Sequence, residues 1–386
     1  NNTQLRLLAG GLNNFGSVVI NPTSGLNFTS FVAEEACAIT GVGTVTLNAN
    51  NNPDTAYIDG GTVGLTIAPQ QNVTGNGRLF GSIINQGSIR GSNIAGQVVR
   101  IRGNVTQTGA GTIVGGVRSV GLDTGSVTGG TFQSSGGPVR ALSGTSSMSG
   151  VVNSGDLQID NNARLTASQF INNGTVTIND GTGLNFTTLT FPGIETLSGF
   201  GQIILKPTGN FDTAYLESTG VGAKLTIGAG QTVRGFGRFY GEFESAALLS
   251  PGLTTGAIGR FEPRGPFTLA SASHIDIDIA GGDPGQYDSI VSNNAVVIGG
   301  SLDLAITGWD PSDPCISIPI VTGSVITGEF FSVTINSPEP PAGRVWRLDY
   351  ELNKVALRLT CAADLNGDCV VDDRDFTRFV VAYNLL

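Results

Sequence analysis

The chain has 386 residues, of which 57 are glycine, and only 13% of its side chains are charged. Its net charge is −10 and it contains three lysines, so no basic patch can neutralise phosphates, and we expect no nucleic-acid partner. The apolar runs are too short to cross a bilayer, so we expect no transmembrane segment. Valine, isoleucine and leucine are interleaved with Thr, Ser, Asn and Gly, which predicts an all-β protein with many turns.

A long internal repeat is the clearest feature of the first 250 residues. Three segments recur in the same order, the first two at one common offset and the third after a two-residue insertion: GLNFTS at Gly25 and GLNFTT at Gly183, DTAY at Asp54 and Asp212, and Leu65–Gly81 with Leu225–Gly241. We infer a tandem duplication that covers about residues 13–90 and 171–250.

A shorter rhythm runs inside each copy. The segments NSGDLQI and NNGTVTI begin at Asn153 and Asn172, 19 residues apart. Coils of about 19 to 23 residues, with alternating apolar side chains and Asn or Gly at the corners, are typical of a parallel β-solenoid. Asparagine and glycine tolerate the positive φ of tight corners, and asparagine side chains can stack between coils. An array of sandwich domains would instead repeat about every 100 residues.

Several segments resemble a known family. Leu65–Ile89 is similar to the coils of autotransporter-type adhesins, which are large secreted bacterial proteins with right-handed β-helices. Ile275–Ile306 and Gly343–Leu359 resemble the compact β unit that closes such helices. The resemblance implies a right-handed parallel β-helix over residues 1–265, a β-rich closing unit over 266–361 and an extracellular, secreted or cell-surface location. Pectin-lyase-type enzymes share this fold, so an enzyme remains an alternative.

The single histidine lies on a strand with alternating burial. His274, Asp276 and Asp278 share one face of SHIDIDIA, and isoleucines occupy the other. Alternate Cα atoms of a strand are about 6.5 Å apart, too far for all three side chains to reach one ion, so we expect a solvated face. Asp54 and Asp212, in the two DTAY segments, are expected to cap turns.

Paired carboxylates are also scarce. Glu242 and Glu244 share a strand face, in a spacing that paired acids of glycosidases can use. The other copy of the duplication has Ser82 and Ile84 at these positions, which favours a solvated face. We therefore expect that the protein is not an enzyme and has no catalytic residues.

A calcium loop is predicted near the end of the chain. Its ligands, at positions 1, 3, 5, 7, 9 and 12 of an EF-hand-type loop, are Asp364, Asn366, Asp368, Val370 through its carbonyl, Asp372 and Asp375. These oxygen ligands suit Ca²⁺, and aspartate at position 12 resembles dockerin loops. Dockerins carry two such loops, and one is found here. A helix over 373–386 should follow, with an apolar face formed by Phe376, Phe379, Val380 and Tyr383.

The four cysteines do not define a disulfide framework. Cys369 occupies position 6 of the loop, where glycine is usual, at a cost of about 1 kcal/mol. Cys361 is near enough in sequence to pair with it, and pairing of Cys361 with Cys315 is equally open. The pairing of Cys37 is open as well.

Low charge, a duplicated body and a calcium-binding tail (residues 362–386) together favour a structural role. We expect a secreted, self-assembling subunit of a cell-surface fibre, layer or matrix, with other copies of the chain as its partners. One alternative is an adhesin that binds carbohydrate, with polysaccharide as partner. The other is a β-helix polysaccharide lyase or hydrolase.

Overall fold

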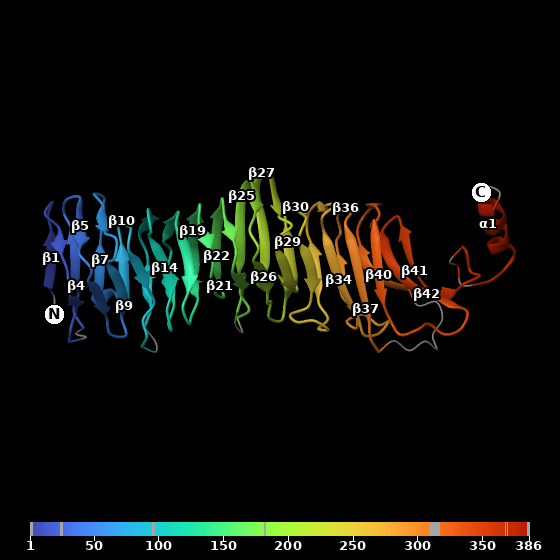
Figure 1. Cartoon of the computed structure of the whole chain (residues 1–386), viewed down its shortest axis with the longest axis horizontal. Helices are drawn as coiled ribbons and strands as arrows, with labels where there is room; N and C mark the ends of the chain where they lie inside the picture. Colours follow the sequence, from blue (N-terminus) through green and yellow to red (C-terminus); the bar gives the residue numbers. More distant parts are fainter. Residues whose placement is uncertain are drawn as a thin grey trace. The chain divides into compact units, whose positions relative to one another are not determined.

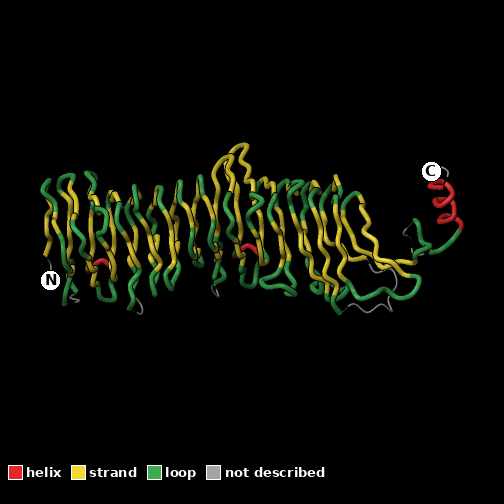
Figure 2. Tube along the Cα trace, in the orientation of Figure 1, coloured by secondary structure: helices red, strands yellow, loops and turns green. Residues whose placement is uncertain are grey.

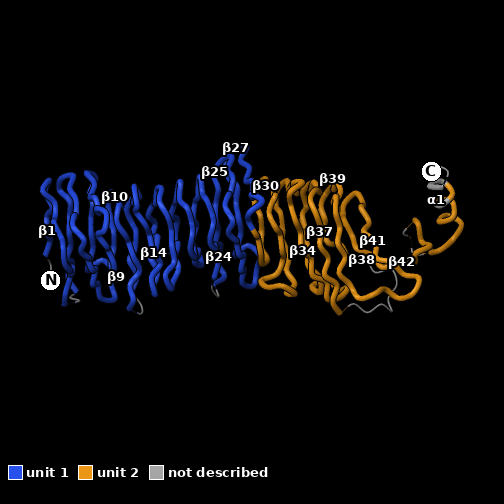
Figure 3. Tube along the Cα trace, viewed as in Figure 1, with its two compact units in different colours: residues 1–231 blue, residues 232–386 orange. Residues whose placement is uncertain are grey.

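The computed structural model describes residues 3–23, 26–94, 97–180, 183–308, 317–366, 368 and 370–383. Almost all regular structure in these residues is β-strand (Figures 1 and 2). The exceptions are the helix α1 (Asp373–Tyr383) and two single turns of 3-10 helix, η1 (Pro53–Thr55) and η2 (Phe211–Thr213). The chain forms two compact units, residues 1–231 and 232–386 (Figure 3).

Unit 1 is a parallel β-helix with three faces, each a ladder of parallel strands from successive coils. Face A contains β1 (Thr3–Leu7), β4 (Thr29–Ala33), β7 (Ala56–Asp59), the second half of β9 (Asn72–Phe80), β12 (Val99–Ile101), β15 (Val120–Leu122), β18 (Val139–Ala141), β21 (Asp156–Ile159), β24 (Thr175–Ile178) and β26 (Gln202–Leu205). Face B contains β2 (Leu12–Asn13), β5 (Cys37–Thr40), β8 (Leu65–Ile67), β10 (Ser82–Asn85), β13 (Asn104–Gln107), β16 (Ser126–Thr128), β19 (Gly144–Ser149), β22 (Ala163–Ser168) and the first halves of β25 (Thr188–Leu197) and β27 (Tyr215–Ile227). The second halves of β25 and β27 continue face C, where Ser198, directly after β25, bridges Ile171. Face C contains β3 (Ser17–Ile20), β6 (Thr44–Asn48), the first half of β9, β11 (Ser88–Arg90), β14 (Thr112–Gly115), β17 (Thr131–Ser134), β20 (Val152–Asn153) and β23 (Ile171–Asn172).

Unit 2 also consists of parallel coils, and it ends in an antiparallel pair. Its first ladder is β28 (Thr232–Gly235), β31 (Leu248–Pro251), β34 (His274–Ile279), β37 (Ser301–Ile306) and β40 (Ser332–Asn336). The second is β29 (Gly237–Tyr240), β32 (Arg260–Pro263), β35 (Ser289–Val291) and β38 (Ser317–Thr322), and the third is β30 (Glu242–Ser245), β33 (Phe267–Leu269), β36 (Val296–Ile298) and β39 (Ile326–Gly328). The last strands, β41 (Arg344–Glu351) and β42 (Lys354–Cys361), pair with each other and β42 with β38, all antiparallel.

The core of unit 1 is built from stacked apolar side chains. On face C, Val45, Val73, Ile89, Ile113 and Phe132 oppose one another from coil to coil, and each is at most 1% exposed. Full burial of such a side chain contributes about 1.5 to 3 kcal/mol. The predicted parallel β-helix with inward Val, Ile and Leu is thus confirmed.

Polar ladders run beside the apolar ones. Asn153 lies opposite Asn172 and donates from Nδ2 to its Oδ1 at 2.9 Å, so the predicted asparagine stacking is confirmed. Asn172 in turn donates to Gln231 Oε1 (3.0 Å), and Gln231 Nε2 returns a bond to the Asn172 carbonyl (2.8 Å). The first copy repeats this exchange between Asn14 and Gln71 at 3.2 and 2.7 Å. These buried amides are satisfied across coils, which fixes the register of the stack.

Coil length varies more than the sequence rhythm suggests. In the middle of unit 1, Thr131 lies opposite Val152, a step that agrees with the predicted coil length. In the two copies each coil contains more residues: Thr29 lies opposite Ala56, and Thr188 lies opposite Tyr215. The predicted coil length is too short there, since the corners of these coils carry longer loops, including those that contain η1 and η2.

Equivalent strands of the two copies lie on different faces of unit 1. Ser17 of β3 is on face C, and seven register steps along that face reach Ile171 of β23. The residue equivalent to Ser17 is Thr175, which follows β23 in sequence and lies on face A. The offset between the copies therefore corresponds to seven coils and one additional face, and the copies are rotated by one face about the solenoid axis.

Among the described residues, no helix combines the length and apolar character needed to span a bilayer.

Candidate functional site

Three of the six predicted calcium ligands converge at the end of unit 2. Carboxylate oxygens of Asp364, Asp368 and Asp375 all lie within 4.8 Å of one another. Asp364 and Asp375 are each 3% exposed, whereas Asp368 is open to solvent. Three carboxylates this close repel one another unless a cation lies between them, and an all-oxygen donor set suits Ca²⁺. The residues present therefore fit the predicted ion.

Hydrogen bonds from backbone N–H groups to carboxylates hold the loop in a conformation that suits a bound cation. Asp375 accepts the N–H of Asn366 through Oδ1 and that of Asp372 through Oδ2, both at 2.9 Å. These two bonds hold the pKa of the Asp375 carboxyl below its ordinary value, so it is ionised, as a cation ligand must be. Asp368 Oδ1 likewise accepts the Val370 N–H at 2.9 Å. The turns that these side chains stabilise draw the ligand positions together.

Contacts from the neighbouring strands fasten the loop. Thr360 of β42 donates its hydroxyl to Asp364 Oδ2. Arg347 of β41 donates to the carbonyl oxygens of Asp364 (3.4 Å) and Leu365 (3.3 Å), and Arg378 of α1 donates to that of Leu365 (3.5 Å). The loop is thus tied to the antiparallel pair on one side and to α1 on the other.

The helix begins at Asp373, as predicted, and part of its predicted apolar face is open. Phe376 is 66% exposed and Val380 is 37% exposed. The side chains of Phe379 and Tyr383, and residues 384–386, lie outside the described residues.

Two of the four cysteines, Cys37 and Cys361, lie among the described residues. Cys37 is a buried free thiol whose pKa is raised, first by burial and then by the charge of Glu35. Cys361 is also free, and Cys315 and Cys369 lie outside the described residues.

The histidine strand gains a partner that sequence spacing did not suggest. His274 Nε2 lies 2.9 Å from Asp276 Oδ1 and 3.4 Å from Oδ2 of Asp303, which stands opposite Asp276 on β37. Its Nδ1 lies 2.7 Å from Ser301 Oγ. Asp278 is directed elsewhere and accepts the Gly256 N–H at 2.8 Å. The half-buried set of His274, Asp276 and Asp303 could hold a cation, but pairing of the imidazole with two carboxylates accounts for the same geometry.

The other acids singled out from the sequence lie apart from these clusters. Glu242 is exposed and Glu244 half-buried on the outer side of β30, with the buried Phe243 between them. The turns at η1 and η2 are capped by asparagine side chains: Asn52 accepts the Asp54 N–H and Asn210 accepts the Asp212 N–H, both at 3.0 Å. Asp54 and Asp212 are therefore the capped residues, which corrects the expectation that they are the caps.

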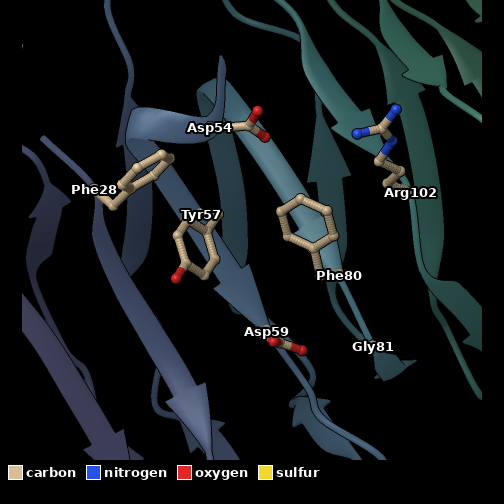
Figure 4. A pocket seen from close by; sticks show the side chains of 7 residues that line it. All are labelled: Phe28, Asp54, Tyr57, Asp59, Phe80, Gly81 and Arg102. Carbon is tan, nitrogen blue, oxygen red and sulfur yellow. The ribbon is translucent and has the colours of Figure 1, made fainter. Parts of the chain in front are cut away.

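Face A of unit 1 carries a cleft that sequence reasoning missed. Its volume is about 600 Å³, and it is lined by Phe28, Asp54, Tyr57, Asp59, Phe80, Gly81 and Arg102. Figure 4 shows the three aromatic rings in a row, with Asp54 on one side of the row and Asp59 on the other. The rings of Tyr57 and Phe80 meet edge to face, with centroids 5.5 Å apart at 89°.

An ion-pair network adjoins this cleft. Arg78 donates from Nη1 to Asp54 Oδ1, and its Nη2 lies 3.5 Å from Asp123. Arg100 and Arg102, from the next coil, lie 4.0 and 3.9 Å from the same Asp123 carboxylate. The network joins four successive coils, and the charges in it nearly balance.

Comparison with models of protein families and with curated proteins gave no match.

Proposed function

We propose that this chain is an extracellular structural protein, a β-helical scaffold that is joined into a surface fibre, layer or matrix through its C-terminal loop and helix. The observation that supports this most directly is the convergence of Asp364 and Asp368 with Asp375, which lies in the first turn of α1, a helix with exposed Phe376 and Val380. A calcium-dependent connector needs both features: a site that calcium orders and an apolar surface that a neighbouring copy can cover.

The chemistry of the loop suits a dockerin-like role. Calcium takes six to eight oxygen ligands. The three converging carboxylates, the side chains of Asn366 and Asp372 and the carbonyl of Val370 would supply them. Bound calcium would supply positive charge between groups that otherwise repel, so it would order the loop and, through Asp375, the start of α1. The partner in this proposal is a second copy of the chain.

Electron microscopy of the full chain at micromolar concentration tests the assembly. We expect polymers in Ca²⁺ and single particles in chelator or after deletion of residues 362–386. Asp375→Asn, which alters a ligand position, should behave like the deletion. Asp373→Asn removes the same charge from a residue outside the ligand set and should assemble normally. Uniform single particles in all conditions would refute assembly through this tail.

The proposed role is non-catalytic. Incubation with a panel of acidic polysaccharides, with and without Ca²⁺, should release no reducing ends and no unsaturated products. Clear cleavage that is lost on changing Glu242 or Glu244 would replace the structural role with that of a lyase or hydrolase.

A further inference from the structure

The outer surface of face A between β4 and β12 has an unusual composition for this molecule. Tyr57 and Asp59 alternate along β7 with the buried Ile58, and Phe80 ends β9 after the buried Leu79, so all three point outward. Phe28, just before β4, is 53% exposed. The edge-to-face contact of Tyr57 with Phe80 stabilises the sheet modestly, but large aromatic side chains that stay partly open to water on successive coils also indicate a binding surface.

We propose that this cleft binds a neutral glycan chain, with Tyr57 and Phe80 as its platform. The cleft volume of about 600 Å³ lies within the usual range for small-ligand sites. Aromatic rings offer apolar faces to the C–H groups of a pyranose, and flanking carboxylates accept hydrogen bonds from its hydroxyls. This role goes beyond the structural one and does not depend on the calcium tail.

The acids beside the rings keep acceptor capacity. Asp59, which lines the cleft, accepts the Gly61 N–H through Oδ1 at 2.8 Å, and its Oδ2 can accept a further hydrogen bond. Asp54 Oδ1 accepts from Arg78, which leaves its Oδ2. Because carboxylates are acceptors only, they suit a ligand rich in hydroxyl donors.

The charges near the cleft favour a neutral ligand over an anionic one. The Arg78 side chain is only 12% exposed and is held between Asp54 and Asp123, so it braces the surface rather than facing a ligand. Arg102 is the cationic residue that lines the cleft, and it lies 3.9 Å from Asp123. With no surplus of positive charge, a phosphate, sulfate or uronate chain would gain little attraction. The perpendicular rings of Tyr57 and Phe80 also suit a puckered sugar better than a flat base.

The second copy of the duplication retains the same residue types, which is an independent observation. The aromatic positions 28, 57 and 80 correspond to Phe186, Tyr215 and Tyr240, the acidic positions 54 and 59 to Asp212 and Glu217, and position 78 to Arg238. Phe186 is 64% exposed, so nothing in the packing accounts for an aromatic residue at that position. Both copies thus combine outward aromatic residues with two acids.

Isothermal titration of the full chain with neutral hexasaccharides tests the inference. The probes are β-linked glucan, xylan, mannan and chitin fragments, with oligogalacturonate and heparin as anionic comparisons. At least one neutral probe should bind, and Tyr57→Ser or Phe80→Ser should weaken that binding about tenfold or more, as expected for loss of a central aromatic contact. Tyr57→Phe, which keeps the ring, should bind within about twofold of the wild type.

Two controls make the outcome decisive. Phe200→Ser removes an aromatic side chain that is 88% exposed in unit 1 but does not line the cleft, and it should leave binding unchanged. Asp375→Asn should also leave it unchanged, which separates this site from the calcium tail. Asp59→Asn provides a second cleft variant if the ring substitutions alter the circular dichroism spectrum. The proposal is overturned if no neutral probe binds at millimolar concentration, if only anionic probes bind, or if Phe200→Ser weakens binding as much as Tyr57→Ser.

Discussion

A buried carboxyl group in unit 2 should make the stability of the protein depend on pH. Asp288 is 0% exposed and accepts two backbone N–H groups, from Gly259 at 2.6 Å and Asp278 at 2.9 Å. Burial raises its pKa from 3.8 to about 7; the two hydrogen bonds oppose this rise, and the charges of Asp278 and Asp276 add to it. The folded state therefore retains a proton that the unfolded chain releases.

The sign and size of the effect follow from linkage. Below pH 3.8 Asp288 is protonated in both the folded and the unfolded state, and its contribution to the free energy of unfolding is at its maximum. As the pH rises from about 4 to about 7, the unfolded state ionises first, so the free energy of unfolding falls. A pKa raised from 3.8 to about 7 corresponds to a loss of about 4 kcal/mol, which is complete above pH 7.

Asp288→Asn isolates this contribution. The amide nitrogen of asparagine cannot accept one of the two N–H groups, so the variant should be less stable by about 1 to 3 kcal/mol at pH 4. It does not ionise, so the difference from the wild type should shrink with rising pH and reverse sign by about pH 8.

Denaturant unfolding of both proteins at pH 4, 5, 6, 7 and 8 gives this difference directly. Titrating groups that do not interact with Asp288 contribute equally to the two proteins and cancel. A difference that stays constant across the series would show that Asp288 ionises normally in the folded state, and the reasoning from burial would fail.

Three further outcomes are expected. Asn172→Ala should lower the free energy of unfolding by about 3 kcal/mol, because it leaves buried amide partners unpaired, whereas Asn173→Ala on the exposed neighbour should cost much less; equal melting temperatures would contradict the ladder. Burial opposes the ionisation of Glu262, but the hydrogen bond from Arg238 and three nearby guanidinium groups hold its pKa below the ordinary value, so Glu262→Gln should cost about 3 kcal/mol at neutral pH. The cost should diminish as the pH falls through that lowered pKa, and a cost that grows in acid would reverse the assignment. Chelation of calcium should increase proteolysis within residues 362–386 and spare the coils, and identical digestion patterns with and without chelator would count against a bound ion.

The convergence of Asp364, Asp368 and Asp375 was predictable because the proposed calcium ligands are contiguous in sequence. The unbroken segment from Asp364 to Asp375 contains every ligand position, and the turn-forming side chains within it determine the local path. Neither packing nor coil length enters this prediction. The tie from Arg347 to the loop carbonyls was not predictable, because it depends on how β41 lies beside the loop.

The clusters on the coils could not be derived in the same way. Asp303 meets His274 because one coil of unit 2 separates them, and the cleft forms because Phe28, Tyr57 and Phe80 come from successive coils. Coil length is far from constant: the step from Leu65 to its partner Ile83 is much shorter than the step from Ile194 to its partner Lys224. Corner loops absorb this variation without changing the alternation of apolar and polar residues, so the sequence does not reveal which outward side chains become neighbours.

The sequence by itself determined the fold class and the duplication and located the proposed calcium loop, since alternation of side chains, repeated segments and ligand spacing are all local properties. Only the tertiary structure decided how the two copies are oriented. Ser17 and Thr175 are equivalent in sequence but lie on faces C and A, because the shorter coils between the copies make their offset equal to seven coils and one face. The face on which a strand of the second copy lies depends on the summed length of all the coils between the copies. A small insertion or deletion in any corner would therefore rotate one copy relative to the other.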